Sequence, residues 1–301
     1  MTRISVQVDL SKSQRTRLSA SARGCDLVWD GTLDGCDVVF GNPEAIEMRD
    51  AADLKWVQLE SVGFGEYLEM DWDILGQRMT MTNLAGFFAD PVAETALAGI
   101  LALGRGIDRL VRHQSGSEWV GDPIRTNLGL LKNARVIMLG HGSINLRLAE
   151  LLAPFHCDFT YFDSTASPQT IERGLPLADI LVAAVPDTPA TRNLMNGYRL
   201  GLLPSHAVLV NLGRGSLVDE VALADALQAR KLGGAVLDVT SDEPLPGEHP
   251  FWTCPNTILT QHSGGGTTDE LDRKIEFFLS NLARYQAGQT LTGRVDLTRG
   301  Y

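Results

Sequence analysis

The chain has 301 residues, of which 44% are hydrophobic, 21% charged and 7% aromatic. This composition excludes a disordered chain, a collagen and a disulfide-stapled miniprotein, and the length suffices for two domains. The 26 Lys and Arg residues against 37 Asp and Glu residues give a formal net charge of -11, which argues against a nucleic-acid partner because the phosphates would be repelled. The longest apolar runs are far shorter than the roughly 20 residues needed to cross a bilayer.

The four cysteines are scattered along the chain, at Cys25, Cys36, Cys157 and Cys254. They form no CxxC pair and have no accompanying histidine at ligand spacing. We therefore expect reduced thiols and no metal site. The first eight residues contain no apolar stretch followed by a small-residue cleavage site, which predicts no signal peptide and a cytoplasmic location.

An α/β pattern occupies the first 90 residues, where short apolar, β-branched runs alternate with helical patterns. Because helices separate the strands, successive strands run in the same direction and form a parallel sheet covered by helices. The predicted strands are residues 4–8, 26–29, 38–41, 56–59 and 79–82, and the predicted helices include residues 11–22 and 43–51.

A long helix is predicted to follow this array. Asp90 is a suitable N-cap and Pro91 a suitable first helical residue, and the apolar pattern continues toward Arg112. The helix has too many apolar residues to be fully solvated, so it packs either between domains or against a second subunit. The polar, glycine-bearing stretch of residues 113–126 is predicted as a loop.

A second array of alternating strands and helices occupies the rest of the chain. Together, the two arrays predict an α/β protein with two doubly wound parallel-sheet domains. The predicted strands are residues 135–140, 159–163, 179–185, 207–212, 235–239 and 257–260, and the predicted helices are residues 144–155, 220–230 and 269–285.

The sequence Gly140-His-Gly-Ser-Ile-Asn145 joins a predicted strand to a helix. Gly140 and Gly142 permit a tight turn and a close backbone approach, while the helix start directs N–H groups and a positive dipole end at a phosphate. Asp163 ends the next strand about twenty residues later, where a carboxylate accepts hydrogen bonds from both ribose hydroxyls of NAD. Asp163 would repel a 2′-phosphate, and no Arg lies between residues 148 and 172, so NAD is favoured over NADP.

Three passages near the end of the chain carry the most specific signal. They are Asn211-Leu-Gly-Arg-Gly-Ser-Leu-Val-Asp-Glu220, Gly234-Ala-Val-Leu-Asp-Val-Thr-Ser-Asp-Glu-Pro-Leu-Pro246 and Pro255-Asn-Thr-Ile-Leu-Thr-Gln-His262. With them the chain resembles the D-isomer-specific 2-hydroxyacid dehydrogenase family over nearly its whole length. Its ending, Val295-Asp-Leu-Thr-Arg-Gly-Tyr301, is similar to the glyoxylate/hydroxypyruvate reductase branch.

The resemblance implies a Rossmann NAD-binding domain of residues 97–271 and a smaller flavodoxin-like substrate domain of residues 1–96 with 272–301. It also implies a homodimeric, NAD-dependent enzyme that transfers a hydride between NADH and a small 2-keto acid such as glyoxylate or hydroxypyruvate. A formate- or phosphite-type dehydrogenase on the same scaffold is an alternative. A non-catalytic NAD-binding regulator is a second alternative, from a different class of protein.

The chemistry of keto-acid reduction accounts for three charged residues that follow strands. Negative charge builds on the carbonyl oxygen, so the site needs a cation near that oxygen and the substrate carboxylate, plus an acid that delivers a proton. Arg214, between two glycines, offers a permanently charged fork for a carboxylate. His262 would donate the proton, and Glu243 would hold its other ring nitrogen. Each residue alone has an ordinary structural interpretation, but together they point to the sheet edge where α/β proteins bind ligands.

Other site residues are implied by the resemblance alone. The backbone of Ser61, Val62 and Gly63 is expected to bind the substrate carboxylate. No Lys or Arg lies between residues 56 and 77, which argues against a phosphorylated substrate. The further cofactor residues are Ser143 and Ile144 at the pyrophosphate, Val185, Pro186 and Thr191 at the adenosine, Leu212, Gly213 and Arg214 at the nicotinamide, Asp238 at the carboxamide, and Gly264 and Gly265 over the cofactor.

Two residues depart from the family pattern. Asn145 stands where a third Gly or Ala is usual, and that position mainly sets the packing of the helix on the strand. Gln261 stands where proline usually precedes the catalytic histidine. Because proline would rigidify that approach, Gln261 is expected to alter the placement of His262, the substrate preference or the rate.

Overall fold

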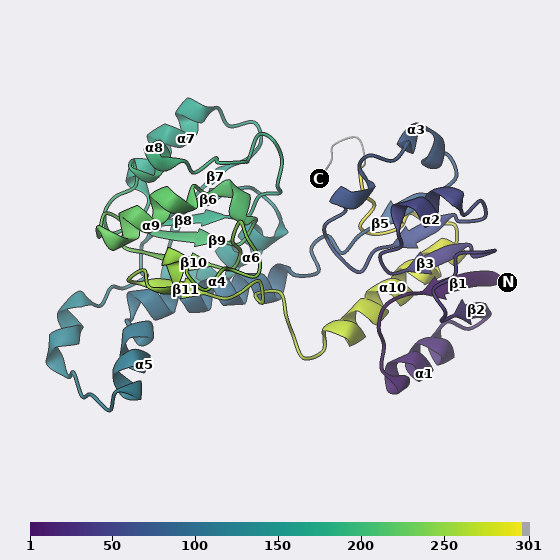
Figure 1. Ribbon diagram of the computed structural model, residues 1–301, viewed down its shortest axis with the longest axis horizontal. Coiled ribbons are helices and arrows are strands. Elements are labelled where there is room, and N and C mark those ends of the chain that lie inside the picture. Colours follow the sequence, from purple (N-terminus) through teal and green to yellow (C-terminus); the bar gives the residue numbers. More distant parts are fainter. Residues whose placement is uncertain (297–301) are drawn as a thin grey trace. The chain divides into compact units, whose positions relative to one another are not determined.

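The computed structural model describes residues 1–296, which form two compact units (Figure 1). The first unit consists of Met1–Phe87 with the C-terminal segment from Thr267, and the second of Phe88–Gly266. The sequence analysis placed the boundaries at 96/97 and 271/272, and a division after residue 96 would cut helix α4 (Ala89–Gly104). The last five residues of the ending that resembles the reductase branch, 297–301, lie outside the described residues.

Within the described residues, the first unit has a five-stranded sheet whose neighbouring strands are all parallel. The strand order β2-β1-β3-β4-β5 is flavodoxin-like. Every residue of β4 is buried, as expected for a strand that is covered on both faces. The strands are β1 (Thr2–Val6), β2 (Cys25–Val28), β3 (Val38–Phe40), β4 (Trp56–Gln58) and β5 (Thr80–Thr82).

Helices from opposite ends of the chain cover one face of this sheet. Helix α1 begins with a capping box, in which Ser11 and Gln14 each bond the other's backbone N–H. Helix α10 packs beside α1, and its Phe278 stacks on Phe40 with ring centroids 4.3 Å apart. Helices α2 and α3 cover the other face. The helices are α1 (Lys12–Ser21), α2 (Ala45–Asp50), α3 (Trp72–Leu75) and α10 (Glu270–Gln286), with the 3-10 helix η1 (Gly65–Tyr67).

The second unit has, within the described residues, a six-stranded parallel sheet of order β11-β10-β9-β8-β6-β7. The order reverses at β6, so the loops after β6 and β8 diverge, and such a point is where doubly wound sheets bind ligands. The predicted fold class of parallel, helix-covered sheets is confirmed. The strands are β6 (Arg135–Leu139), β7 (Asp158–Phe162), β8 (Ile180–Ala183), β9 (Val208–Asn211), β10 (Gly234–Leu237) and β11 (Thr257–Leu259).

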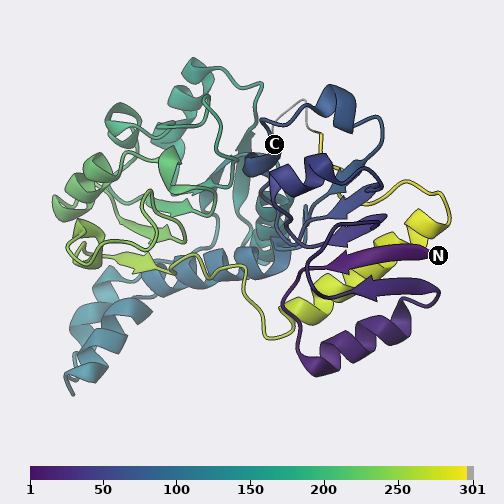
Figure 2. The same ribbon diagram turned by 45° about the vertical axis from the view of Figure 1, so that its right-hand side comes forward.

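Helices also cover both faces of the second sheet (Figure 2). Alternate residues of β6 serve the two layers, because successive side chains of a strand point to opposite faces. Val136 and Met138 pack under α4 and α6, whereas Ile137 and Leu139 join the layer of α7, α8 and α9. The elements not yet given are α5 (Ile107–Ser115), α6 (Ser143–Leu152), α7 (Pro168–Gly174), α8 (Gly197–Leu200), α9 (Glu220–Gln228), η2 (Asp122–Asn127), η3 (Ala153–Phe155), η4 (Leu175–Leu177), η5 (Gly215–Leu217) and η6 (Pro250–Trp252).

The prediction of one long helix from Pro91 to Arg112 is wrong. Helix α4 ends at Gly104, Gly106 has a φ of 62°, and α5 starts at the next residue. Glycine has low helix propensity and enters the left-handed region without a steric penalty, so these two glycines break the helix. The helix start also differs, since Phe88 rather than Asp90 is the N-cap residue. The predicted loop of residues 113–126 contains the end of α5 and most of η2.

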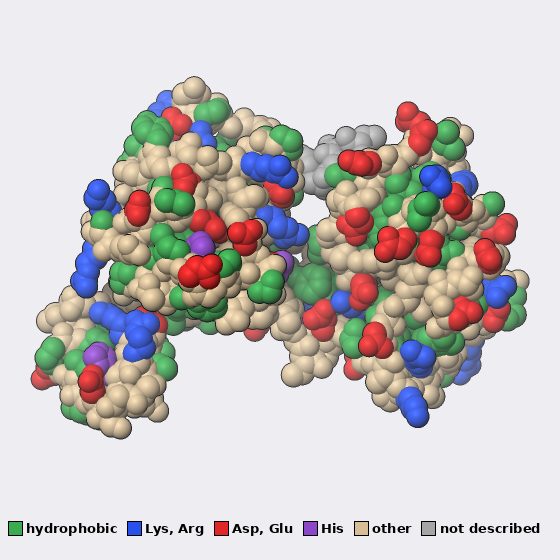
Figure 3. Space-filling view, viewed as in Figure 1, with side chains coloured by type: hydrophobic (Ala, Val, Ile, Leu, Met, Phe, Trp, Pro, Cys, Tyr) green, Lys and Arg blue, Asp and Glu red, His purple; other side chains and the backbone are tan. Residues whose placement is uncertain are grey.

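The surface carries charges of both signs. On the face drawn in Figure 3, acidic and basic side chains are interspersed on both units, and no continuous basic stripe is visible. Among the described residues, no helix is both long and apolar enough to span a membrane.

Asp179 joins the starts of three strands of the second sheet, and we predict that it is important for stability. Its carboxylate accepts hydrogen bonds from the backbone N–H and guanidinium of Arg135 at 2.8 to 3.2 Å, and lies 2.9 Å from His206 Nε2. The Arg135 guanidinium, helped by His206, holds the pKa of Asp179 well below its ordinary value despite partial burial. We expect Asp179→Asn to lower the free energy of unfolding at pH 7 by about 1.5 to 3 kcal/mol.

The effect must depend on pH in one direction. Because the folded-state pKa lies below the unfolded one, this stabilisation is complete above the unfolded pKa and is lost as pH falls toward the folded pKa. In urea unfolding, the free energies of unfolding of the wild type and of Asp179→Asn should therefore differ strongly at pH 7 and less near pH 3.5. Asp122→Asn is the matched control, because its ion pair with Arg125 is highly exposed. Equal loss of stability in both variants would contradict the prediction.

Candidate active site

Three predicted catalytic residues follow three adjacent strands of the second unit. Arg214 comes after β9, Glu243 after β10 and His262 after β11, and these strands are neighbours in the parallel sheet. The carboxyl ends of parallel strands share one edge, so the three loops emerge on the same side.

The structure pairs His262 with Glu243. The Nδ1 atom of the imidazole lies 2.6 Å from Oε2 of the carboxylate, and Oε1 accepts a hydrogen bond of 3.0 Å from the N–H of Thr240. Burial raises the pKa of Glu243, but the hydrogen bonds from His262 and Thr240 and the charge of Arg214 outweigh it, so the pKa is lowered. An ionised Glu243 keeps the proton on Nδ1, which leaves Nε2 as the atom that exchanges a proton with a substrate.

Asp238 fixes the backbone around the histidine. Its carbonyl accepts a hydrogen bond of 2.6 Å from the N–H of His262. Its carboxylate Oδ1 accepts from the Thr260 hydroxyl and, at 3.0 Å, from the N–H of Gly264. A Cβ on Gly264 would lie 2.8 Å from this carboxylate, so only glycine fits there without a shift. Asp238 and Gly264, both predicted at the cofactor, are therefore in direct contact, and Gly265 follows at the ring of Phe88.

The backbone at Gln261 explains the departure from proline. Gln261 and His262 have φ angles of 54° and 55°, in the left-handed region that few non-glycine residues adopt. Proline is locked near -65° and is unable to take this conformation. The chain thus approaches the histidine by a path closed to proline, at a conformational cost on the order of 1 to 3 kcal/mol per residue. Gln261 was expected to alter the placement of His262, the substrate preference or the rate. The backbone geometry bears on the first of these, the placement of His262.

Arg214 is exposed on a loop that is held at both ends. The side chain of Asn211 donates to the Arg214 carbonyl at 3.0 Å and accepts from the N–H of Gly213 at 3.2 Å. A Cβ on Gly213 would lie 2.7 Å from the carbonyl oxygen of Val185, and one on Gly215 would overlap the backbone of Thr240. The two glycines around Arg214 are therefore needed for close backbone approach, and the second brings this loop against the loop of Glu243. Leu212, also predicted at the nicotinamide, is buried.

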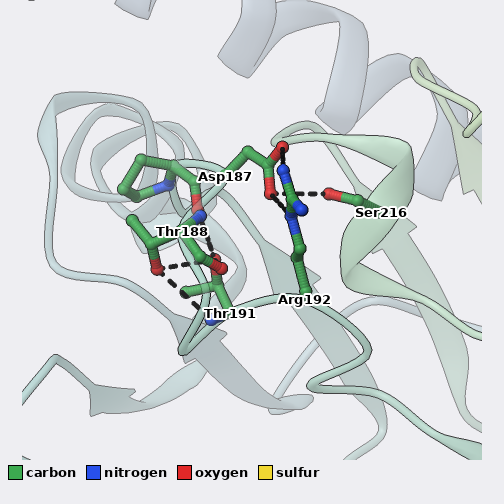
Figure 4. Close-up of polar contacts among 6 residues, drawn as sticks. Asp187, Thr188, Thr191, Arg192 and Ser216 are labelled. Carbon is green, nitrogen blue, oxygen red and sulfur yellow. Dashed lines mark hydrogen bonds and ion pairs between the residues drawn. The ribbon is translucent and has the colours of Figure 1, made fainter. Parts of the chain in front are cut away.

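A polar cluster supports the loop after β8 (Figure 4). The Thr191 hydroxyl donates to the carbonyl of Pro186 at 2.6 Å, so it shapes the loop from within. Arg192 forms two hydrogen bonds with Asp187, at 3.0 and 3.3 Å, and Ser216 donates to the same carboxylate at 3.1 Å. Sequence reasoning named Pro186 and Thr191 but missed the others. The opposite charges of Asp187 and Arg192, five residues apart, could have indicated their ion pair from the sequence. Nothing in the sequence indicates that Ser216 joins it.

The glycine turn has the geometry of a phosphate cradle. Gly140 has a φ of 98°, and a Cβ there would lie 2.8 Å from the carbonyl oxygen of Ala184. Gly142 is the N-cap residue of α6, and a Cβ at that position would meet no atom within 4 Å. Open space therefore borders a helix start at Ser143 and Ile144, whose N–H groups and dipole attract an anion. The residues present fit the pyrophosphate of a dinucleotide.

Asn145 replaces the third glycine by bonding to the strand end. Its side-chain amide is fully buried and donates to the carbonyls of Leu139 and Gly140 at 3.0 and 2.9 Å. Its Oδ1 has no hydrogen-bond partner within the described residues. The amide thus ties the start of α6 to the end of β6 at the position where glycine would permit closer packing.

Asp163 is exposed at the end of β7, next to the glycine turn. Its Oδ1 accepts from the hydroxyl and the N–H of Thr165 at 2.6 and 2.9 Å, and these bonds lower its pKa. His141 of the turn packs against Tyr161 with ring centroids 4.6 Å apart. An ionised carboxylate at this place suits ribose hydroxyls and disfavours a 2′-phosphate.

The predicted carboxylate loop lies in the first unit. Ser61 donates to the Gly63 carbonyl at 2.7 Å, and Asn83 donates to the Val62 carbonyl at 2.7 Å. Within residues 1–296, the N–H groups of Val62 and Gly63 donate no hydrogen bond, which leaves them for a ligand.

One cation near this loop was missed by the sequence analysis. Lys274 of α10 lies 3.5 Å from Glu60 and 2.9 Å from Glu270. Residues 56–77 contain no Lys or Arg, but in the fold Lys274 lies beside this stretch. Two carboxylates neutralise that cation. In the described part of the chain, no three His, Cys, Asp or Glu side chains gather as a metal site.

Comparisons with known proteins find relatives along most of the chain. The family model described as D-isomer specific 2-hydroxyacid dehydrogenase, NAD binding domain, matches residues 97–264. Hydroxyphenylpyruvate reductase of Plectranthus scutellarioides is 33% identical over 84% of this chain and 83% of its own length. Glyoxylate/hydroxypyruvate reductase A of Arabidopsis thaliana is 30% identical over 70% and 69%. A crystal structure of a D-isomer specific 2-hydroxyacid dehydrogenase from Xanthobacter autotrophicus, in complex with NADPH and MES, has a TM-score of 0.81 at 25% identity and covers 100% of this chain and 99% of that one.

Proposed function

Because this chain belongs to the D-isomer-specific 2-hydroxyacid dehydrogenase family, we propose that it reduces a small 2-keto acid such as glyoxylate or hydroxypyruvate with NADH. The chain is an oxidoreductase with the NAD-binding domain of that family. The observation that carries the proposal is the 2.6 Å pair of His262 and Glu243 on the loops next to that of Arg214.

Each residue of the proposed site has a separate role in the reduction. Bound NADH supplies the hydride. The guanidinium of Arg214 stabilises the negative charge that grows on the carbonyl oxygen and orients the substrate carboxylate. His262, with Nδ1 held by Glu243, donates a proton from Nε2 to that oxygen and takes it back in the reverse direction. The N–H groups of Val62 and Gly63 are proposed to bind the carboxylate.

Turnover of a substrate panel tests the proposal. Glyoxylate, hydroxypyruvate and pyruvate are mixed with NADH, and formate and phosphite with NAD, and the change in NADH absorbance is followed. We expect steady NADH consumption with at least one keto acid. Tight NADH binding without turnover of any acid would favour an NAD-binding regulator, and NADH production from formate or phosphite would favour the other dehydrogenase class.

We predict that Asp163 sets the preference for NAD over NADP. Asp163→Ala should lower kcat/KM for NADH by about one to two orders of magnitude, because a hydrogen bond to a carboxylate contributes roughly 1.5 to 3 kcal/mol. The kcat/KM for NADPH should stay the same or rise, because the substitution removes a charge that repels the 2′-phosphate. Asp158→Ala, at the other end of the same strand, is the control and should change neither. A wild-type enzyme that preferred NADPH would contradict the assignment.

We also propose a homodimer and a cytoplasmic location. No residue of α5 is buried in the described chain, and Ile107, Leu110 and Val111 leave an apolar strip on it exposed. Contact with a second copy would cover this strip. In light scattering we expect the mass of two chains. Val111→Asp should lower this mass, whereas the control Val221→Asp, at an exposed valine on α9, should not. A wild-type particle of one chain would contradict the dimer.

The proposed cytoplasmic location fits the cysteines. All four are free, as in a reducing compartment.

A further inference from the structure

A cavity of about 420 Å³ borders the His262–Glu243 pair on the second unit. Both residues form part of its wall, so a molecule whose carbonyl oxygen meets the imidazole has this space beside it. Most of the remaining lining residues are apolar, namely Leu237, Pro244, Leu245, Trp252 and Leu259. The cavity lies wholly among loops and strand ends of one unit.

Apart from His262, the polar groups in the wall give the cavity no cation. Among the residues that line it there is no Lys or Arg. Oδ1 of the Asp238 carboxylate is bonded to Thr260 and Gly264, and a carboxylate has no proton donor to offer an anion. The indole N–H of Trp252 donates to the Pro246 carbonyl at 2.8 Å, so its polar edge is satisfied within the loop. Besides His262, the wall offers an anion only the neutral side-chain amide of Gln261, so this surface favours an apolar group over a second carboxylate or a phosphate.

The cavity is larger than the substituent of either keto acid named above. Besides the carboxylate, the carbonyl carbon of glyoxylate carries only hydrogen, and that of hydroxypyruvate carries one hydroxymethyl group. A protein cavity of about 150 Å³ lined by apolar side chains already admits benzene. The space beside His262 is therefore sufficient for a phenyl ring and its methylene link.

We propose that this cavity receives the substituent of the 2-keto acid, and that the preferred substrates carry an apolar or aromatic side chain up to the size of a benzyl group. The inference rests on the proposed function, because it assigns a substrate class to the same site. Glyoxylate remains a substrate but leaves the cavity unfilled. Each methylene group that enters should raise kcat/KM by about fourfold.

The first test uses the wild-type enzyme with saturating NADH. The substrates are glyoxylate, pyruvate, 2-ketobutyrate, 2-ketopentanoate and phenylpyruvate. We expect kcat/KM to rise along the series and phenylpyruvate to exceed pyruvate at least tenfold. A flat or falling series, with glyoxylate still reduced, overturns the inference and leaves the proposed function intact. No reduction of any acid overturns both.

The second test fills the cavity. Leu245→Trp should lower the ratio of kcat/KM for phenylpyruvate to that for glyoxylate by at least 20-fold, because the added indole occupies the space of the substituent. Leu177→Trp, at an exposed leucine of η4 that does not line the cavity, is the matched control and should keep the ratio within twofold. An equal ratio in both variants overturns the inference. The wild-type series decides the question independently if the filled variant does not fold.

Discussion

Replacing His262 by asparagine lowers kcat for keto-acid reduction by about 100-fold or more, the scale expected for a positioned general acid. The imidazole, which lies 2.6 Å from Glu243, is the group that we propose as the proton donor. NADH affinity should hold, because the glycine turn at Gly140 and the carboxylate of Asp163 are untouched. Single-turnover kinetics and fluorescence titration with NADH measure the two quantities separately.

The chain contains a matched control for this substitution. His113 of α5 lies 2.7 Å from Glu118 of the following loop in a comparable His–Glu pair outside the proposed site. His113→Asn should leave kcat unchanged. Near-wild-type turnover by His262→Asn on the best substrate would remove the proton-donor assignment, and Gln261 would then be examined as its replacement.

The pH profile follows from the same pair. Glu243 has a lowered pKa, because the hydrogen bonds from His262 and Thr240 outweigh its burial, so its carboxylate stays ionised to lower pH than an ordinary glutamate. Turnover that depends on the bond between this carboxylate and Nδ1 of His262 is therefore kept above the pKa of Glu243 and lost as pH falls through it. Glu243→Gln should remove this acid limb of the profile, because an amide does not titrate. An unchanged profile would mean that the pair does not control proton transfer.

Arg214→Lys should lower kcat/KM for the keto acid by about 10²- to 10³-fold. Lysine keeps the charge but loses the planar fork that binds a carboxylate through two parallel hydrogen bonds. The Kd for NADH should change by less than about threefold, because Asn211 and Gly213 hold the loop through the backbone.

Arg230→Lys is the control for the arginine substitution, since this residue follows α9 and lies outside the site. Both variants are compared by steady-state kinetics on the same acid. A loss below tenfold for Arg214→Lys would show that the guanidinium does not bind the reacting acid.

The sequence by itself determined the parts of this protein that depend on local order. Runs of β-branched residues between helical patterns identified the parallel sheets, and the pattern of residues 11–22 predicted a helix that the structure has at Lys12–Ser21. The turn from Gly140 to Asn145 and the aspartate at the end of the next strand predicted a dinucleotide site. His262, Glu243 and Arg214 were predicted from three motifs and the chemistry of keto-acid reduction, and each follows a strand, a position that in a parallel sheet lies at one edge.

Tertiary structure decided the features that depend on residues far apart in the chain. Lys274 reaches Glu60 only because α10 packs on the first sheet, and Ser216 reaches Asp187 only because the loops after β8 and β9 are neighbours. The left-handed backbone at Gln261 occurs beside the bond from the N–H of His262 to the carbonyl of Asp238 at the end of another strand, a contact that no local propensity encodes. The cavity beside His262 is likewise formed by strand ends and a loop that meet only in the fold. Local periodicity specifies elements, whereas packing specifies which side chains of different elements face one another.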